Sequence, residues 1–257
     1  MKSMKVILLQ TDICWADPAA NVAYMDKLIS AHAQGTDLFV LPEMFSTGFC
    51  TSPEGIAESS DSATLRWMKQ KAAERNCAIA GSVSVEENGK FYNRFYFVHP
   101  DGNVQWYNKK HLFTYGGEDK HYTAGQERVV VNFRGVRFLL EVCYDLRFPQ
   151  LFRRQTGVDC FLLPAAFTTN TGKAHWEVLL RARAIENLSY VVAAAQAGRS
   201  SCGRAFWGHS CAVDPWGTVV GSLNGHETGV CFTDVDPAFL RQVRALLPAL
   251  NNRVKYE

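Results

Sequence analysis

The chain has 257 residues, of which 47% are hydrophobic and 20% are charged. This composition is typical of a globular protein that can bury a large core. The net charge of +2, without a long run of one sign, argues against a nucleic-acid or membrane partner. No stretch approaches the roughly 18 apolar residues that a membrane-spanning helix needs.

The first ten residues contain too short an apolar run for a secretory signal peptide. We therefore expect a cytoplasmic protein whose chain begins with a strand. Eight cysteines are present, but none forms a CxxC pair, so we expect no metal site. In a reducing compartment each cysteine is expected to be a free thiol.

Apolar spacing in the first half of the chain alternates between strand and helix periods. Strands are predicted over Met4–Gln10, Leu38–Leu41, Ala78–Val85, Phe91–Val98 and Val104–Tyr107, and helices over Asn21–Ala33 and Ser62–Arg75. The dipeptides Asn88-Gly89 and Asp101-Gly102 predict tight hairpin turns between the last three of these strands.

The second half continues in the same way. Strands are predicted over Arg128–Phe133, Val136–Val142, Asp159–Leu163, Tyr190–Ala195, Ser210–Val213 and Thr218–Leu223, and helices over Phe148–Gln155, Lys173–Asn187 and Asp236–Leu247. Pro164 is expected to end the strand that precedes it. Pro237 and Pro248 bracket the last helix, as helix boundaries commonly require.

Strands that alternate with helices indicate an α/β protein, but the tight turns favour mixed rather than purely parallel sheets. Two sheets stacked face to face, with helices outside, would use all these elements. A single doubly wound sheet is the alternative. Because the chain contains no linker, repeat or low-complexity segment, we expect one domain over residues 1–257.

Two apolar runs end in a chemically reactive side chain. Glu43 follows the run from Leu38 to Pro42, and Cys143 follows the run from Phe138 to Val142. A strand end fixes the position of such a group while the loop gives access to it. Apolar neighbours would raise the pKa of Glu43 and make it a usable base. The charged segment after Cys143 places a cation nearby, which would favour a thiolate.

Other polar residues leave alternatives open. Alternation along an extended segment lets either Lys109 or Lys110 face inward, and spacing does not choose between them. Glu118, in a Gly-rich stretch, is by default a surface residue. A papain-like enzyme would pair the cysteine with a histidine, and the available histidines are His111, His121, His175 and His209. A non-enzymatic binding module is a further alternative.

The segments Leu41–Glu43, Lys109–Phe113 and Cys143–Pro149 resemble the three signature blocks of the nitrilase (carbon–nitrogen hydrolase) superfamily. They occur in the family's order and at comparable spacing. The resemblance continues through the segments His175–Asn187, Trp207–Ser210 and Asp214–Gly217. It implies a four-layer α-β-β-α sandwich with two mixed sheets, and a homodimer in which the C-terminal segment crosses to the partner.

The resemblance also implies a Glu–Lys–Cys amidase that needs no metal or organic cofactor. Carried over by position, Glu43 is the general base, Cys143 the nucleophile and Lys109 the catalytic lysine. The Lys109 ammonium and the backbone N–H of Tyr144 would stabilise the oxyanion. Glu118 matches the family's second glutamate, which would hold the other groups in register.

Leu41–Phe49 and Thr114–Gly125 resemble the ω-amidases, which deaminate 2-oxoglutaramate and 2-oxosuccinamate. Deaminated-glutathione amidases, which resemble the later blocks equally, are the alternative. Both substrate types carry a carboxylate, so the pocket should hold a cation, for which Arg147 is the candidate. Phe45, Phe167 and Trp207 are candidates for the pocket wall, with core packing as the other interpretation of each.

Overall fold

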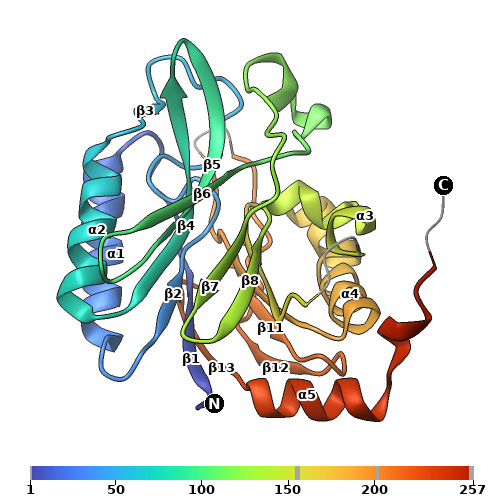
Figure 1. Ribbon diagram of the computed structural model, residues 1–257. Helices are drawn as coiled ribbons and strands as arrows, with labels where there is room; N and C mark the ends of the chain where they lie inside the picture. The colour runs from blue at the N-terminus through green and yellow to red at the C-terminus, as the bar shows by residue number, and fades with distance from the viewer. Residues whose placement is uncertain (1, 154–156, 201–202, 255–257) are drawn as a thin grey trace.

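The computed structural model describes residues 2–153, 157–200 and 203–254, and its strands form two sheets (Figure 1). The first sheet has the order β13-β1-β2-β4-β5-β6, and β3 pairs with β4. Its strands are β1 (Met4–Gln10), β2 (Leu38–Val40), β3 (Glu58–Ser59), β4 (Ala78–Glu87), β5 (Lys90–Val98), β6 (Val104–Asn108) and β13 (Gly229–Val235).

The second sheet has the order β12-β11-β10-β9-β8-β7. Its strands are β7 (Val130–Phe133), β8 (Val136–Leu140), β9 (Cys160–Ala165), β10 (Tyr190–Ala195), β11 (Cys211–Val213) and β12 (Val219–Ser222). Parallel pairs lie at the centre of each sheet and antiparallel pairs at its edges, so both sheets are mixed, as predicted.

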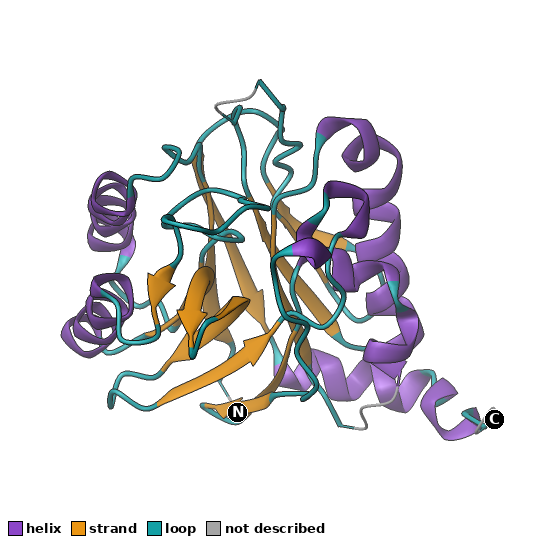
Figure 2. Cartoon of the chain, turned by 90° about the horizontal axis from the view of Figure 1, so that it is seen from above, coloured by secondary structure: helices purple, strands orange, loops and turns teal. Residues whose placement is uncertain are grey.

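Helices cover the outer face of each sheet (Figures 1 and 2). The helices are α1 (Pro18–His32), α2 (Ala63–Arg75), α3 (Pro149–Arg153), α4 (Thr169–Asn187) and α5 (Pro237–Leu246). The side chains of Asp17, Ser62 and Asp236 accept hydrogen bonds from the first-turn N–H groups of α1, α2 and α5, which explains where these helices begin. No helix in the described ranges is long and apolar enough to cross a membrane.

The hydrophobic core has two main layers. The larger cluster lies between the sheets, where side chains such as Leu8 and Phe97 of the first sheet meet Phe138 of the second. The other cluster packs the opposite face of the first sheet, for example Ile79, against Met68 of α2 and its neighbours. The order of layers is therefore α-β-β-α, which confirms the sandwich and excludes the doubly wound single sheet.

Several element predictions need correction. β13 and the short β3 were not predicted, and α4 begins at Thr169 rather than Lys173. Pro164 does not end its strand, because β9 continues to Ala165. The predicted helix Phe148–Gln155 is described only over Pro149–Arg153, since residues 154–156 lie outside the described ranges.

Pro164 is tolerated because of the sheet register. Leu162 O accepts a hydrogen bond from Glu141 N, so alternate residues of β9 face β8. The ladder between β8 and β9 ends at the pair Leu140–Leu162. The missing N–H of Pro164 therefore points past the end of β8, where no strand needs it.

Candidate active site

Three of the four predicted catalytic residues follow strands of the two sheets, and all four converge at one end of the sandwich. Glu43 follows β2 and Lys109 follows β6 in the first sheet, and Cys143 follows β8 in the second. Cys143 begins the 3₁₀ helix η3 (Cys143–Arg147), and Glu118 begins η2 (Glu118–Lys120). The side chains of Glu43, Lys109 and Glu118 are fully buried.

Hydrogen bonds join the three charged groups. Lys109 Nζ lies 2.9 Å from Glu43 Oε1 and 2.8 Å from Glu118 Oε2. Asn93 Nδ2 donates to both carboxylates, at 2.8 Å to Glu43 Oε1 and 3.2 Å to Glu118 Oε1. The backbone N–H of Phe113 donates to Glu118 Oε2 at 2.6 Å. Glu118 is thus an interior residue and not the surface residue that its Gly-rich surroundings suggest.

The two oxygens of Glu43 have different environments. Oε1 accepts from both Lys109 and Asn93, whereas Oε2 has no hydrogen-bond partner among the described residues. Glu43 and the Cys143 thiol are close enough that each shifts the pKa of the other. Glu43 therefore has one oxygen fixed by donors and one free to accept a proton.

Burial dominates the ionisation of these groups. It raises the pKa of Glu43 above the usual carboxyl value, and the charge of Lys109 only partly offsets it. Burial and then the charge of Glu43 hold the pKa of the Cys143 thiol well above its usual value. Burial alone would lower the pKa of Lys109, but the charges of Glu118 and Glu43 outweigh it and raise that pKa. Burial therefore favours the neutral thiol over the expected thiolate, although the charge of Lys109 does lower the pKa of Cys143 as a nearby cation should.

The backbone presents the thiol at a sharp turn. Cys143 has φ of 45°, in the left-handed region that non-glycine residues rarely adopt. Val142 before it is extended, so the backbone changes direction at Cys143. Val142 N donates to Asp145 Oδ2 at 3.0 Å, and Asp145 N donates to Val142 O at 3.0 Å. These bonds fix a strained conformation of the kind that accumulates at functional sites.

A small pocket opens onto Cys143 and Lys109. The other lining residues are Phe49, Phe113, Tyr144, Arg147, Ala166, Phe167, Thr168 and Thr171. Its free volume is about 30 Å³, which admits a water molecule but not a five-carbon amide. Arg147 contacts His175 at 3.2 Å and lies 5.2 Å from the Phe167 ring centre, and it forms no ion pair within the described ranges.

Two of the four predicted substrate-binding residues line this pocket, namely Arg147 and Phe167. Phe45 does not, because it is fully buried against Trp67 in the cluster between the first sheet and α1 and α2. Met44 has φ of 47°, so Phe45 leaves the strand in a different direction from Glu43.

Trp207 also lies outside the pocket lining. Its ring stacks on His209 with centroids 4.2 Å apart, and its backbone N–H donates to Phe167 O at 2.7 Å. Trp207 therefore supports the strand end that carries Phe167. Phe49 and Phe113, which the sequence did not single out, supply the aromatic wall in place of Phe45 and Trp207.

The structure separates the adjacent lysines. Lys110 Nζ is exposed and donates to Gln126 O, whereas Lys109 faces the interior. Asn93, which connects both carboxylates, was missed. It lies opposite Lys109, whose N–H donates to Asn93 O at 2.9 Å. The available signal was a single amide side chain within the predicted strand Phe91–Val98. A buried amide needs polar partners, so its presence there indicates other polar groups nearby.

Among the residues that the structure describes, no histidine lines the pocket beside Cys143. His111 Nδ1 lies 3.0 Å from Asp145 Oδ1, and its ring stacks on Phe148. His121 contacts Glu54 at 2.7 Å, and His209 stacks on Trp207. The geometry therefore favours Glu43 over histidine as the partner of the thiol.

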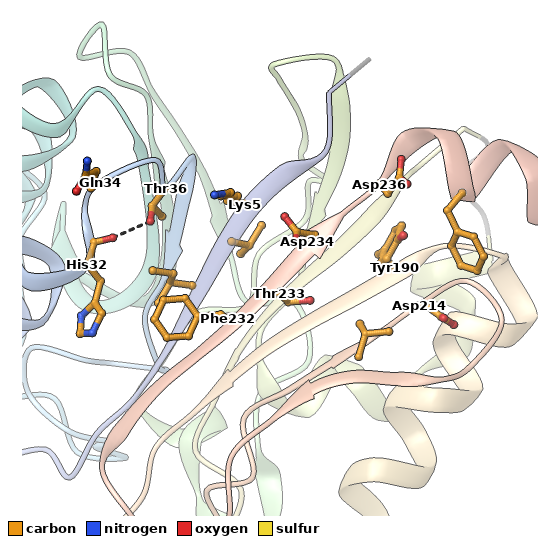
Figure 3. A pocket seen from close by; sticks show the side chains of 14 residues that line it. Lys5, His32, Gln34, Thr36, Tyr190, Asp214, Phe232, Thr233, Asp234 and Asp236 are labelled. Carbon is orange, nitrogen blue, oxygen red and sulfur yellow. Dashed lines mark hydrogen bonds between the residues drawn. The ribbon is translucent and has the colours of Figure 1, made fainter.

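A larger hollow lies elsewhere among the described residues. A groove of about 710 Å³ runs beside β1 and β13 (Figure 3). Lys5, His32, Asp214, Phe232 and Asp234 are among its lining residues, but the nucleophile and its three charged partners are not. A choice by cavity size alone would thus select a groove that lacks the predicted catalytic residues. No group of three or more His, Cys, Asp or Glu side chains in the described ranges is arranged to hold a metal ion.

Comparisons with curated proteins identify relatives of similar length. The chain is 37% identical to the omega-amidase YafV of Escherichia coli K12, over 97% of this chain and 96% of that protein. It is 32% identical to the 2-oxoglutaramate amidase of Bacillus subtilis, over 95% of each. It is 36% identical to a deaminated glutathione amidase of Synechocystis, over 91% of this chain and 92% of that protein.

The solved structures and the family models agree with this. XC1258 from Xanthomonas campestris, a CN-hydrolase superfamily protein solved with an arsenic adduct in its active site, superposes with a TM-score of 0.95 at 35% identity. The match covers 100% of this chain and 99% of that one. The model of the carbon–nitrogen hydrolase family matches residues 5–245. This chain therefore belongs to the carbon–nitrogen hydrolase family.

Proposed function

We propose that this protein is an ω-amidase that hydrolyses 2-oxoglutaramate and 2-oxosuccinamate to the corresponding 2-oxo acids and ammonia. One observation carries the proposal. A buried thiol interacts with the carboxylate of Glu43, whose Oε2 has no hydrogen-bond partner among the described residues, and the ammonium group of Lys109 lies next to both. The same pocket is lined by Arg147, which forms no ion pair with a described residue. The relatives named omega-amidase and 2-oxoglutaramate amidase match over nearly their full length.

In the first half-reaction, Glu43 takes the thiol proton of Cys143 as the sulfur attacks the amide carbon. The carbonyl π bond opens, and its oxygen becomes an oxyanion. The Lys109 ammonium and the N–H of Tyr144 stabilise that charge, and removing one such donor typically costs about 10²–10³ in rate. Protonated Glu43 then gives its proton to the nitrogen as the C–N bond breaks, so ammonia leaves and a thioester remains.

In the second half-reaction, Glu43 takes a proton from water as the water oxygen attacks the thioester carbon. The tetrahedral species collapses, the C–S bond breaks, and the proton returns to the sulfur. Glu118 contacts no reacting atom in this scheme. Its hydrogen bonds with Lys109 and Asn93 hold the ammonium in position, so we assign it a positioning role.

Arg147 is proposed to bind the substrate carboxylate, because it lines the pocket and makes no competing ion pair with a described residue. The pocket is too small for the substrate as it stands. We propose that Phe49 and Phe113, whose ring centroids lie 6.4 Å apart at its wall, move when the substrate enters.

Deaminated glutathione is the second candidate substrate, because the relative acting on it is almost as similar to this chain. The narrow pocket favours the shorter amides. An ammonia-release assay with equal concentrations of 2-oxoglutaramate, 2-oxosuccinamate and deaminated glutathione separates the two. A kcat/KM higher for deaminated glutathione would overturn the assignment of substrate and leave the amidase class intact.

Cys143→Ala should abolish ammonia release while the circular dichroism spectrum stays unchanged. The exposed Cys14 offers a matched control, since Cys14→Ala should keep full activity. Intact mass spectrometry with a slow substrate should detect an acyl adduct in the wild type and Cys14→Ala, but not in Cys143→Ala. An active Cys143→Ala variant would refute the proposed chemistry.

We further propose that the protein acts in the cytoplasm as a homodimer. Val178 and Ile185 lie on the outer face of α4 with 68% and 48% of their surface exposed, and Trp216 is 52% exposed. Apolar side chains gathered in this way suit an interface between subunits. Light scattering should give twice the monomer mass, and Val178→Asp should reduce it. Cell fractionation tests the compartment.

A further inference from the structure

The mechanism leaves one fully buried acid unexplained. Glu141 lies two residues before Cys143 and has no exposed surface. Its Oε2 lies 3.1 Å from the hydroxyl oxygen of Tyr107, and its Oε1 has no hydrogen-bond partner among the described residues. A buried carboxylate with so few donors is costly unless it is neutral.

The hydrogen-bond count around Asp145 fixes the direction of the neighbouring bonds. Asp145 Oδ2 lies 3.0 Å from Val142 N and 2.9 Å from the Tyr107 hydroxyl. Its Oδ1 lies 2.9 Å from His111 N and 3.0 Å from His111 Nδ1. An ionised carboxylate has about four acceptor sites. When Tyr107 donates to it, all the acceptor sites of an ionised Asp145 are occupied.

The Tyr107 hydroxyl has a single proton, and Asp145 takes it. Its oxygen already accepts from Lys110 N at 3.0 Å, which leaves one lone pair facing Glu141. Two acceptors cannot form a hydrogen bond, so the proton in the 3.1 Å contact must come from Glu141.

We propose that Glu141 is a neutral carboxylic acid that donates to Tyr107 and, through Tyr107 and Asp145, positions the Lys109 segment against the Cys143 turn. Tyr107 lies two residues before Lys109 in the first sheet, and Asp145 lies two residues after Cys143 beyond the second. The chain of bonds therefore spans both sheets. The positioning role of Glu141 in the reaction rests on the proposed function. The protonation state of Glu141 does not.

The charges around Glu141 agree with the neutral form. Burial and then the negative charge of Asp145 raise the pKa of Glu141 well above its usual value. Tyr107 opposes this through its hydrogen bond, and Arg128 opposes it through its charge. An ionised Glu141 would place a second negative charge beside Asp145 and leave two acceptors facing each other at Tyr107.

Infrared difference spectroscopy tests the protonation state directly. A wild-type minus Glu141→Gln spectrum at neutral pH should contain the C=O band of a protonated carboxylic acid, and that band should shift in D₂O. The glutamine amide can replace the acid as donor to Tyr107, so the variant should fold. A difference spectrum with carboxylate bands alone would overturn the proposal.

The stability difference between wild type and Glu141→Gln provides a second readout. An acid whose folded pKa is raised binds its proton in the folded state and releases it on unfolding above about pH 4.3, so its stability falls as pH rises. Relative to wild type, the folding constant of Glu141→Gln should therefore gain up to about tenfold per pH unit. A pH-independent difference would refute a raised pKa.

Kinetics test the positioning role. Tyr107→Phe removes the link to Asp145 and should lower kcat, by up to about 10²-fold if the Lys109 segment shifts, with little change in KM. Glu141→Gln should keep kcat near wild type at neutral pH. A Tyr107→Phe variant with wild-type kcat would overturn the positioning role. If wild type itself releases no ammonia, the proposed function fails, while the infrared and stability results still decide the state of Glu141.

Discussion

Replacing Lys109 with Met tests whether the buried charges act as one unit. Lys109 Nζ contacts Glu43 at 2.9 Å and Glu118 at 2.8 Å, and all three side chains are fully buried. Methionine keeps most of the side-chain length but removes the charge. The two carboxylates would then keep neutral donors without a cation, namely the Asn93 amide nitrogen that they share and, for Glu118, the Phe113 N–H.

Removing one partner of a buried ion pair typically costs about 3–5 kcal/mol, because the remaining charge is left uncompensated. A total stability of roughly 5–15 kcal/mol makes this a large fraction. At about 2–4 °C per kcal/mol, the melting temperature of Lys109→Met should fall on the order of 6–20 °C. The loss of the apolar contacts of the lysine stem is small beside this, since methionine replaces them.

The companion variants are Glu118→Gln and the double variant Lys109→Met/Glu118→Gln. In the double variant only one carboxylate stays buried, so it should be less destabilised than the sum of the single effects, by about 0.5–3 kcal/mol. Differential scanning calorimetry at neutral pH, with circular dichroism to verify the folded state, measures the cycle.

The sign of the pH effect is a further check. Without Lys109, the pKa of the carboxylate pair rises in the folded state, so the folded form holds more protons than the unfolded form. Stability then falls as pH increases. The deficit of Lys109→Met should thus be smaller near about pH 5 than near about pH 8. A deficit that is additive and independent of pH would refute the charge coupling.

Three further outcomes are expected. The kcat/KM for 2-oxoglutaramate should rise as pH increases through the raised pKa of Glu43, because only the ionised carboxylate accepts the thiol proton. Glu43→Gln should show no such rise, because it is inactive at every pH. Asn93→Ala should lower kcat by roughly 10–10², because Glu43 and Glu118 lose their shared donor; steady-state rates with a melting curve measure this. Arg147→Gln should raise KM for 2-oxoglutaramate but not for an uncharged short amide, and equal effects on both would argue against carboxylate binding.

Sequence reasoning singled out Glu43 and Cys143, which the structure brings together, because strand ends are visible in the chain. Apolar runs that stop at Glu43 and at Cys143 indicate where buried backbone gives way to a loop. The choice of Lys109 over Lys110 could not come from alternation, which is symmetric between neighbours. It depends on which strand face meets the other sheet, and that is a property of the tertiary structure.

Sequence proximity was misleading for Phe45. It lies two residues from Glu43, so alternation places both on one face. The positive φ of Met44 breaks the alternation and sends the ring into the opposite core layer. No composition signal marks such a turn when the residue is not glycine.

β13 was missed because it is an edge strand that exposes an apolar side chain to solvent, so its sequence does not alternate as a half-buried strand should. Cys231, Thr233 and Val235 are buried, and the alternate Phe232 is 61% exposed. An exposed phenylalanine and a buried threonine reverse the polarity that period-two reasoning depends on. Only the antiparallel pairing with β1 explains why this segment is extended.

The proposed mechanism requires Glu43 to be a base toward a thiol and an acid toward departing ammonia. A carboxyl group at its ordinary pKa of about 4.3 would suit neither step well near neutrality. Burial raises the pKa of Glu43, which makes it a better proton acceptor, and the charge of Lys109 limits that rise so that Glu43 is not simply neutralised. In that mechanism Lys109 acts on both the Glu43 carboxylate and the oxyanion, so its removal should impair proton transfer as well as charge stabilisation.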